Sequence, residues 1–132
     1  MDMQIDFPGN QKVNAYFQGF TVQTVQSKRQ GGDGEHPTPF DLFLASLGTC
    51  AGIFVIKFCE KRDLDTRDIN ISMHNDWNKE TSFVENINIT IHLPSTFPAK
   101  YRSAVIRAAE QCTVKKHFDQ APEFKIKTEL ET

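Results

Sequence analysis

The chain has 132 residues, of which 39% are hydrophobic and 11 are phenylalanines, so it can build one domain with a real core. Its formal net charge of −2 argues against a nucleic-acid-binding surface, because such surfaces carry a basic excess. The longest stretch without a charged residue, Leu42 to Ile56, is too short to span a bilayer. The sequence shows no signal peptide, repeat or linker, so we expect a single cytoplasmic domain over residues 1–132 that binds neither nucleic acid nor membrane.

The first part of the chain predicts an antiparallel meander. Met3, Ile5 and Phe7 alternate with polar residues, which is the pattern of a strand with one buried face. Two more strands are expected over residues 13–17 and 20–25, because turn residues separate these apolar runs.

A polar loop over residues 27–38 leads into a helix that is apolar on nearly every side. The loop is rich in glycine but lacks the spacing of a phosphate-binding loop, so a turn is expected. Thr38, Pro39 and Asp41 have the order of a helix start, with a capping residue, a first-position proline and the acidic member of a capping box. The helix should run to about Lys61, buried in a large core or a subunit interface.

The second half of the chain predicts two strands, a second helix and a final strand. These are strands over residues 69–73 and 87–93 joined by a turn at 75–81, a helix that places Tyr101, Val105, Ala108 and Cys112 on one buried stripe, and a strand from Phe124 to Leu130. The fold class is therefore α+β, an antiparallel sheet with two cysteine-bearing helices.

Cys50 and Cys59 lie on the first of these helices. They are about half a turn out of phase and about 13 Å apart along the axis, so they cannot form a disulfide within one helix. Cys59 is therefore expected to be core packing, a role that any of the three cysteines could have. Cys50 lies too deep in the helix for its amino terminus to activate the thiol, so reaction needs a cation or hydrogen-bond donor from elsewhere. We name Arg29, in the polar loop, as the candidate.

Cys112 has a different setting. Lys115 and Lys116 follow it by three and four residues, and their positive charge should favour its thiolate. In a reducing compartment a disulfide between such cysteines is expected to be transient and catalytic.

The four histidines show no zinc-binding spacing, so no metal or other cofactor is expected. A triad of Cys50 with His36 and Asp41 is a weak alternative. Asp41 already serves as a cap and lies some 13 Å from Cys50 along the same helix.

The run from Gly31 to Cys50, followed by Cys112-Thr113-Val114, resembles the OsmC/Ohr family of osmotically induced and organic-hydroperoxide-resistance proteins. The resemblance covers nearly the whole chain in order. It implies an intertwined homodimer with antiparallel sheets packed on two central cysteine-bearing helices. It also implies two active sites at the subunit interface, each with Cys50 as the peroxidatic and Cys112 as the resolving cysteine.

The resemblance implies that in active members of that family a glutamate, which usually follows the helix-start proline directly, holds an arginine beside the reactive thiol. Here Phe40 occupies that position and the acid comes one residue later, as Asp41. The resemblance therefore leaves open which residues activate Cys50. Arg29 with Glu35 could act from the loop.

Three functions follow as hypotheses. The first is a thiol-dependent peroxidase, reduced by an external dithiol, in which the apolar Leu47, Ile53 and Phe54 favour an organic hydroperoxide as the substrate. The second is a non-catalytic dimer that binds a hydrophobic small molecule at its interface. Phe40 favours this hypothesis because it stands where the resemblance implies a glutamate. The third and weakest is a thiol hydrolase that pairs Cys50 with an imidazole such as that of His36.

Overall fold

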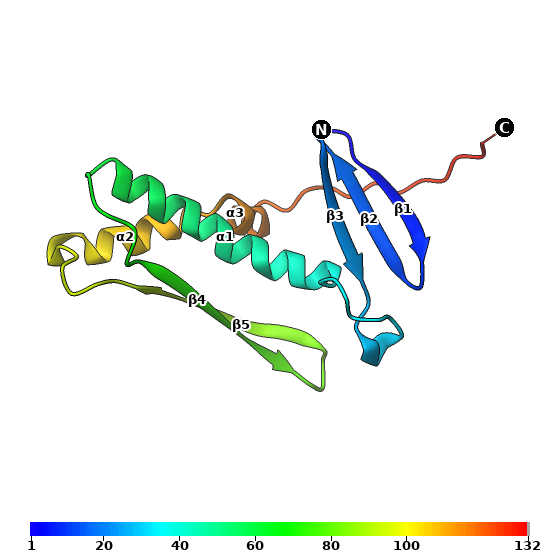
Figure 1. Ribbon diagram of the computed structural model, residues 1–132, viewed down its shortest axis with the longest axis horizontal. Helices are drawn as coiled ribbons and strands as arrows, with labels where there is room; N and C mark the ends of the chain where they lie inside the picture. Colours follow the sequence, from blue (N-terminus) through cyan, green and yellow to red (C-terminus); the bar gives the residue numbers. More distant parts are fainter. Residues whose placement is uncertain (132) are drawn as a thin grey trace. The chain divides into compact units, whose positions relative to one another are not determined.

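The computed structural model describes residues 1–131, which fall into two compact units divided between Ser46 and Leu47. The elements of the first unit are β1 (Gln4–Gly9), β2 (Lys12–Phe17), β3 (Phe20–Val25), the short 3₁₀ helix η1 (Lys28–Gln30) and the start of α1 (Pro39–Glu60). Those of the second are the rest of α1, β4 (Asn70–Asn78), β5 (Phe83–His92), a short 3₁₀ helix η2 (Ala99–Tyr101), α2 (Arg102–Ala109) and α3 (Thr113–Asp119) (Figure 1). The predicted α+β class is confirmed.

The meander predicted for the first unit is confirmed. Strands β1, β2 and β3 form one antiparallel sheet in that order, with Ile5 opposite Ala15 and Ala15 opposite Val22. Residues directly opposite one another share a face, so these three belong to one apolar side of the sheet. Phe7 and Phe20, which the alternation places on the same side, are 80% and 63% exposed.

The glycine-rich loop is a tight turn, as expected. Gly31 ends η1 with φ of 101°, a left-handed conformation that glycine adopts without strain. At Gly32 a Cβ atom would lie 1.9 Å from the carbonyl oxygen of Gln26, so any other residue would collide with the main chain there.

The start of α1 follows the predicted capping box. The main-chain N–H of Asp41 donates to Thr38 Oγ1 at 3.1 Å, and the N–H of Thr38 donates to Asp41 Oδ2 at 2.9 Å. The reciprocal pair satisfies donors that the first turn would leave open. The helix ends at Glu60, one residue before the predicted end.

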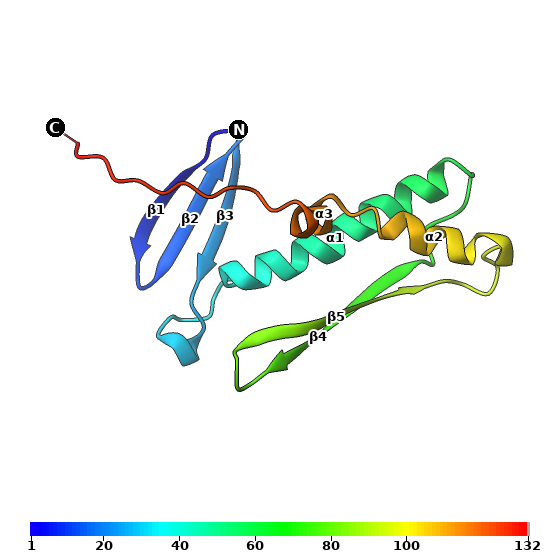
Figure 2. The same cartoon turned by 180° about the vertical axis from the view of Figure 1, so that it is seen from behind.

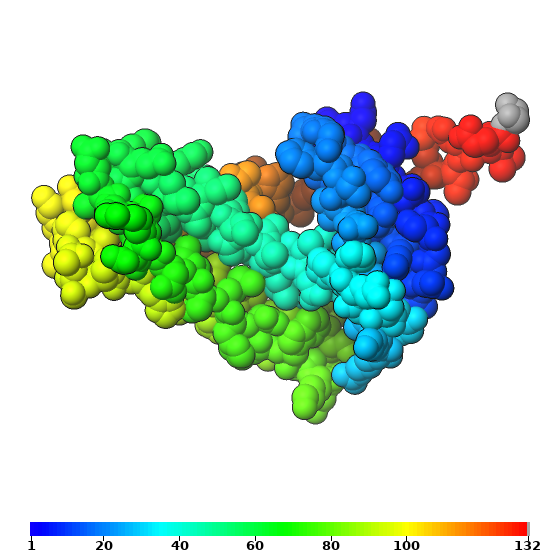
Figure 3. All heavy atoms as spheres, in the orientation of Figure 1, coloured from blue at the N-terminus to red at the C-terminus, as the bar shows by residue number. Residues whose placement is uncertain are grey.

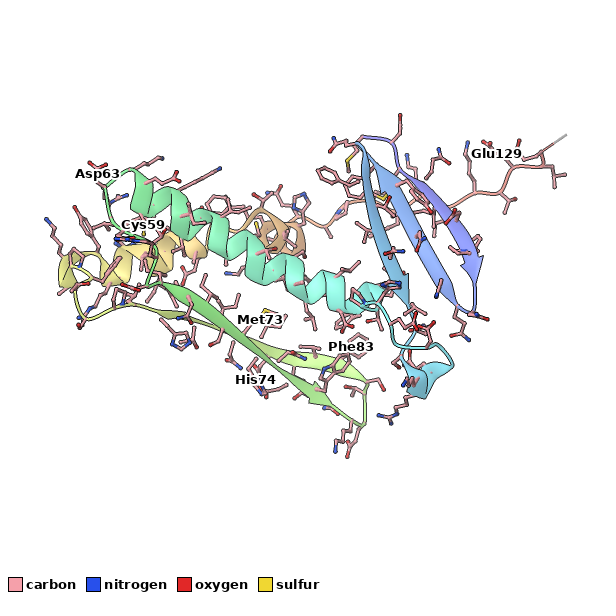
Figure 4. The ribbon with its side chains drawn as sticks, viewed as in Figure 1. Cys59, Asp63, Met73, His74, Phe83 and Glu129 are labelled. Carbon is pink, nitrogen blue, oxygen red and sulfur yellow. The ribbon has the colours of Figure 1, made fainter. Side chains whose placement is uncertain are left out.

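In the second unit, the β4–β5 hairpin packs on α1 through one apolar face. Ile71 lies opposite Ile91 and Met73 opposite Ile89 in the ladder. A Cβ atom on Gly48 would lie 3.7 Å from Met73 Sδ, so this glycine brings the helix close to the strand. Figure 4 shows Met73 between the hairpin and α1, whereas His74 points to the opposite side.

Cys59 is fully buried at the other end of α1, where Figure 4 labels it. It lies in a cluster with four other buried residues, Val55, Phe58, Phe97 and Val105. The expectation that Cys59 is core packing is confirmed.

The prediction of one continuous second helix that reaches Cys112 is wrong. Helix α2 ends at Ala109, and a separate α3 begins at Thr113. The break occurs because Cys112 adopts a non-helical conformation (φ −45°, ψ 119°) and becomes the residue that caps α3. Cys112 is nevertheless buried, as its place on the stripe predicted.

The strand predicted from Phe124 to Leu130 is also wrong, because residues 120–131 form no regular element. Phe124, Ile126 and Leu130 are almost fully exposed, so no second strand among the described residues receives them. A strand without a neighbour cannot exchange ladder hydrogen bonds. The β4–β5 hairpin, in contrast, is longer than predicted, and its turn lies at residues 79–82.

Helix α1 is only partly buried within the chain, so of the two settings predicted for it, a large core or a subunit interface, this chain alone does not supply the first. Only 33% of its most apolar window is buried, and Ile53 and Ile56 are about half exposed. Figure 3 shows the second half of α1 reaching the surface. By length and composition alone the 22-residue helix could cross a membrane, which is weak evidence because core helices meet the same criterion.

Candidate active site

Cys50 and Cys112 meet where α1 passes the junction of α2 and α3. Their side chains form a hydrogen bond, and both thiols are free. Cys112 Sγ also lies 4.0 Å from the carbonyl oxygen of Leu47, one turn before Cys50 on α1. Both ribbon views show α3 beside the middle of α1 (Figures 1 and 2). The structure thus brings together the two cysteines predicted as a pair.

The surroundings of Cys50 favour its thiolate. Burial acts to raise the pKa of this half-buried thiol, but hydrogen-bond donors outweigh it and the pKa lies below its usual value. The largest lowering comes from the main-chain N–H of Val114, followed by the Cys112 thiol and then by the N–H and the hydroxyl of Thr113. None of these groups is a cation or an imidazole. Cys50 is therefore activated by donors from the start of α3.

Cys112 has the opposite character. Burial raises its pKa, and the hydrogen bond with Cys50 raises it further, against a lowering contribution from the N–H of Lys115. That N–H donates to Cys112 Sγ at 3.4 Å. The expectation that lysine charge favours a Cys112 thiolate is wrong, because the contact of Lys115 is through its main chain and burial prevails. Cys112 is set up to stay protonated next to a Cys50 thiolate.

A cavity of about 830 Å³ opens next to this pair, within the second unit. Its walls are mainly apolar side chains of α1, β5, α2 and α3, and Cys112 lies in its lining. The apolar members are Leu47, Ala51, Val84, Ile87, Ile89, Ile91, Leu93, Val105, Ile106, Ala109 and Phe118. Of the apolar residues predicted to line the site, Leu47 does so and Ile53 is instead 51% exposed.

The comparisons with known proteins agree with this arrangement. The family model of OsmC-like proteins matches residues 32–127, which include both cysteines. The chain belongs to the OsmC-like protein family. A search of curated proteins finds no match.

Solved structures share the fold of this OsmC-like protein at low identity. A Psychrobacter arcticus 273-4 protein, named for osmotic stress induction and a detoxification response, has a TM-score of 0.75 at 18% identity over 86% of this chain and 85% of its own. The organic hydroperoxide resistance protein OsmC of Legionella pneumophila has a TM-score of 0.58 at 15% identity over 89% and 87% of the two chains. An organic hydroperoxide resistance protein of Elizabethkingia anophelis has a TM-score of 0.56 at 13% identity over 89% and 88%.

The loop residues predicted to assist Cys50 lie in the first unit of this OsmC-like protein. Arg29 belongs to η1, and Glu35 follows in the loop, where its carboxylate forms an ion pair with Lys12 at 3.8 Å. Their position relative to Cys50 stays a prediction. The carboxylate of Asp41 serves the helix cap, as described above.

The sequence analysis missed Thr113 and Val114. In a helix that continued through Cys112, their N–H groups would donate to carbonyls four residues earlier and would not be available to Cys50. The available signal was Thr113 itself, since a threonine inside a helical run favours a helix start over a helix interior. Among the described residues, no group of three or more metal-ligating side chains is found.

Proposed function

We propose that this OsmC-like protein is a thiol-dependent peroxidase that reduces organic hydroperoxides. The observation that carries the proposal is the hydrogen-bonded pair of Cys50 and Cys112, in which one pKa is lowered and the other raised. A peroxidase that resolves through an internal disulfide needs a thiolate to attack and a neighbouring thiol to resolve. The relatives named for organic hydroperoxide resistance support the same redox and stress-defence role.

In the proposed reaction, the Cys50 thiolate attacks the terminal oxygen of the hydroperoxide. A sulfur–oxygen bond forms as the oxygen–oxygen bond breaks, leaving a sulfenic acid on Cys50 and an alkoxide that takes a proton from water. The Cys112 thiol then displaces hydroxide from the sulfenic acid, and its proton completes a water molecule. An external dithiol reduces the resulting disulfide and is itself oxidised to a disulfide.

The cavity beside Cys112 supports a hydrophobic substrate. A volume of about 830 Å³ is in the range of sites for small organic molecules, and its wall is mostly aliphatic. The alkyl or aryl part of an organic hydroperoxide gains from leaving water for such a wall, whereas hydrogen peroxide has no apolar part to bury.

The functional unit that we propose is a homodimer. Ile53 and Ile56 on α1 are about half exposed, and Phe7 and Phe20 on the β1–β2–β3 sheet are more exposed still. Large apolar side chains exposed on either unit are candidates for an interaction surface. A cytoplasmic location is part of the proposal, because the reducing compartment keeps the thiols available.

A second candidate function is the binding of a hydrophobic small molecule without turnover. Two features favour it: the apolar cavity, and Phe40 at the position where the family resemblance implies a glutamate. In this case Cys112 would form part of a ligand-binding wall and the thiols would react slowly.

One experiment separates the two functions. The reduced protein is mixed with one equivalent of cumene hydroperoxide or hydrogen peroxide, thiol loss is followed in time, and the products are identified by peptide mass spectrometry. A peroxidase loses the Cys50 and Cys112 thiols together and reacts faster with cumene hydroperoxide. Equal slow loss of thiols with both oxidants, together with binding of cumyl alcohol by calorimetry, would favour the ligand-binding function.

A further inference from the structure

Thr113 is the first residue of α3 and follows the resolving cysteine directly. Cys112 fixes this position twice, because its sulfur lies against Leu47 of α1 and also accepts the N–H of Lys115. With Cys112 buried on α1, the next residue is held beside Cys50, one turn further along the same helix from Leu47. The location of Thr113 therefore follows from the packing of Cys112.

The first N–H groups of a helix have no partner within it. In α3 the N–H groups of Lys115 and Lys116 are taken by the side chain and the carbonyl of Cys112. The N–H groups of Thr113 and Val114 are directed instead to the Cys50 sulfur. The hydroxyl of Thr113 joins them, so one residue supplies two of the donors around that sulfur.

The Thr113 hydroxyl differs from the Cys112 thiol, the other side-chain donor to Cys50, in one respect. The Cys112 proton is consumed when the disulfide forms, whereas the Thr113 hydroxyl takes no part in that bond. Thr113 is also exposed and Cys50 is only half-buried, so neither residue is closed off from solvent.

We propose that Thr113 is a catalytic residue, donating the hydrogen of its hydroxyl to the Cys50 sulfur and holding the thiolate in place for attack. The assignment rests on the proposed peroxidase function. As the sulfur–oxygen bond forms, negative charge leaves the sulfur for the departing alkoxide, which takes its proton from water. The threonine hydroxyl keeps its own proton throughout and only loses its strong acceptor.

The test compares Thr113→Val with Thr113→Ser, and uses Thr81→Val in the β4–β5 turn as a matched control. Valine keeps the shape and the N–H but removes the hydroxyl, and serine keeps the hydroxyl. For each variant, the rate of Cys50 alkylation by iodoacetamide is measured across a pH series and assigned to the site by mass spectrometry. Thermal unfolding checks that each variant is folded, and Thr113→Ala replaces the valine variant if that one fails to fold.

We expect the midpoint of the alkylation profile to rise by about one pH unit in Thr113→Val, which makes Cys50 about tenfold slower below that midpoint. Single-turnover reaction with cumene hydroperoxide should slow by a similar factor, and Thr113→Ser and Thr81→Val should match the parent. A Thr113→Val profile equal to that of the parent overturns the assignment even if the parent is an active peroxidase. If the profile shifts but the parent consumes no peroxide, the proposed function fails and the catalytic role of Thr113 falls with it.

Discussion

Cys50 and Cys112 share one hydrogen bond that acts in opposite directions on their two thiols. Burial acts to raise the pKa of each, but the shared hydrogen bond lowers the pKa of Cys50 and raises that of Cys112. The remaining donors at the start of α3 act on Cys50 as well. A pair of similar thiols thereby becomes one nucleophile and one proton-bearing partner.

The first prediction is the order in which the thiols titrate. A thiol reacts as its thiolate, so its alkylation rate rises with pH and levels off above its pKa. Cys50, with a lowered pKa, should level off at a lower pH than Cys112 and Cys59, both of which have raised pKa values because of burial. Site-resolved alkylation from pH 6 to 11 checks this order. A Cys112 profile that levels off first would contradict the assignment of roles.

The second prediction is the disulfide that forms on mild oxidation. Cys50 and Cys112 should be linked and Cys59 should stay free, because Cys59 is fully buried in the core cluster. Non-reducing peptide mapping checks the linkage, and Cys59 in the main disulfide would be the contrary result.

Cys50→Ser should abolish peroxide turnover, whereas Cys112→Ser should consume one equivalent of peroxide and stop at the sulfenic acid.

The spacing of apolar residues predicted most of the fold, because the residues that an element buries recur within its own sequence at the period of a strand or a helix. The β1–β2–β3 meander, the capping box of Thr38 and Asp41, and the burial of Cys59 and Cys112 all follow from alternation, helical phase or end signals. The strand predicted at the end of the chain does not form, although its sequence has the local pattern. Its alternation is present, but strand formation needs a neighbour that a local pattern cannot supply.

The activation of Cys50 could not be derived in the same way. Which donors face a sulfur depends on where two helices meet, and here that point depends on the break at Cys112. A continuous helix would have directed the N–H groups of Thr113 and Val114 to carbonyls four residues earlier. The sequence therefore identified the two cysteines, while the conformation of one residue decided how they are activated.

The third prediction concerns Arg29. If the loop adds a cation to the hydrogen-bond donors at Cys50, Arg29→Met should raise the pKa of Cys50 and slow its reaction with peroxide while the protein stays folded. We expect a smaller effect than that of Thr113→Val, because the donors of α3 already outweigh burial. The alkylation pH series measures it, with Lys28→Met as the neighbouring control. Identical profiles for Arg29→Met and the parent would make Arg29 a loop residue only.

The fourth prediction tests the core of the second unit. Val105 of α2 is fully buried, whereas the adjacent Ile106 is 52% exposed. Val105→Ala should lower the free energy of unfolding by about 2 kcal/mol, because it removes buried methyl groups and leaves a cavity. Ile106→Ala should change it by about 0.5 kcal/mol or less. Urea unfolding measures both, and similar losses for the two variants would contradict the packing described.

The fifth prediction is the dimer. The exposed apolar side chains of α1 should be covered by a second subunit, since large apolar surfaces left in water favour association. Light scattering at micromolar concentration should give twice the mass of the chain. Ile53→Glu should shift that mass toward the monomer, because burying an unpaired carboxylate at an interface is costly. Lys61→Glu, a charge change at an exposed position just beyond α1, should leave the dimer intact. A parent protein that is monomeric under these conditions would refute the proposal. An Ile53→Glu variant that stays fully dimeric would show that the dimer interface does not include this face of α1.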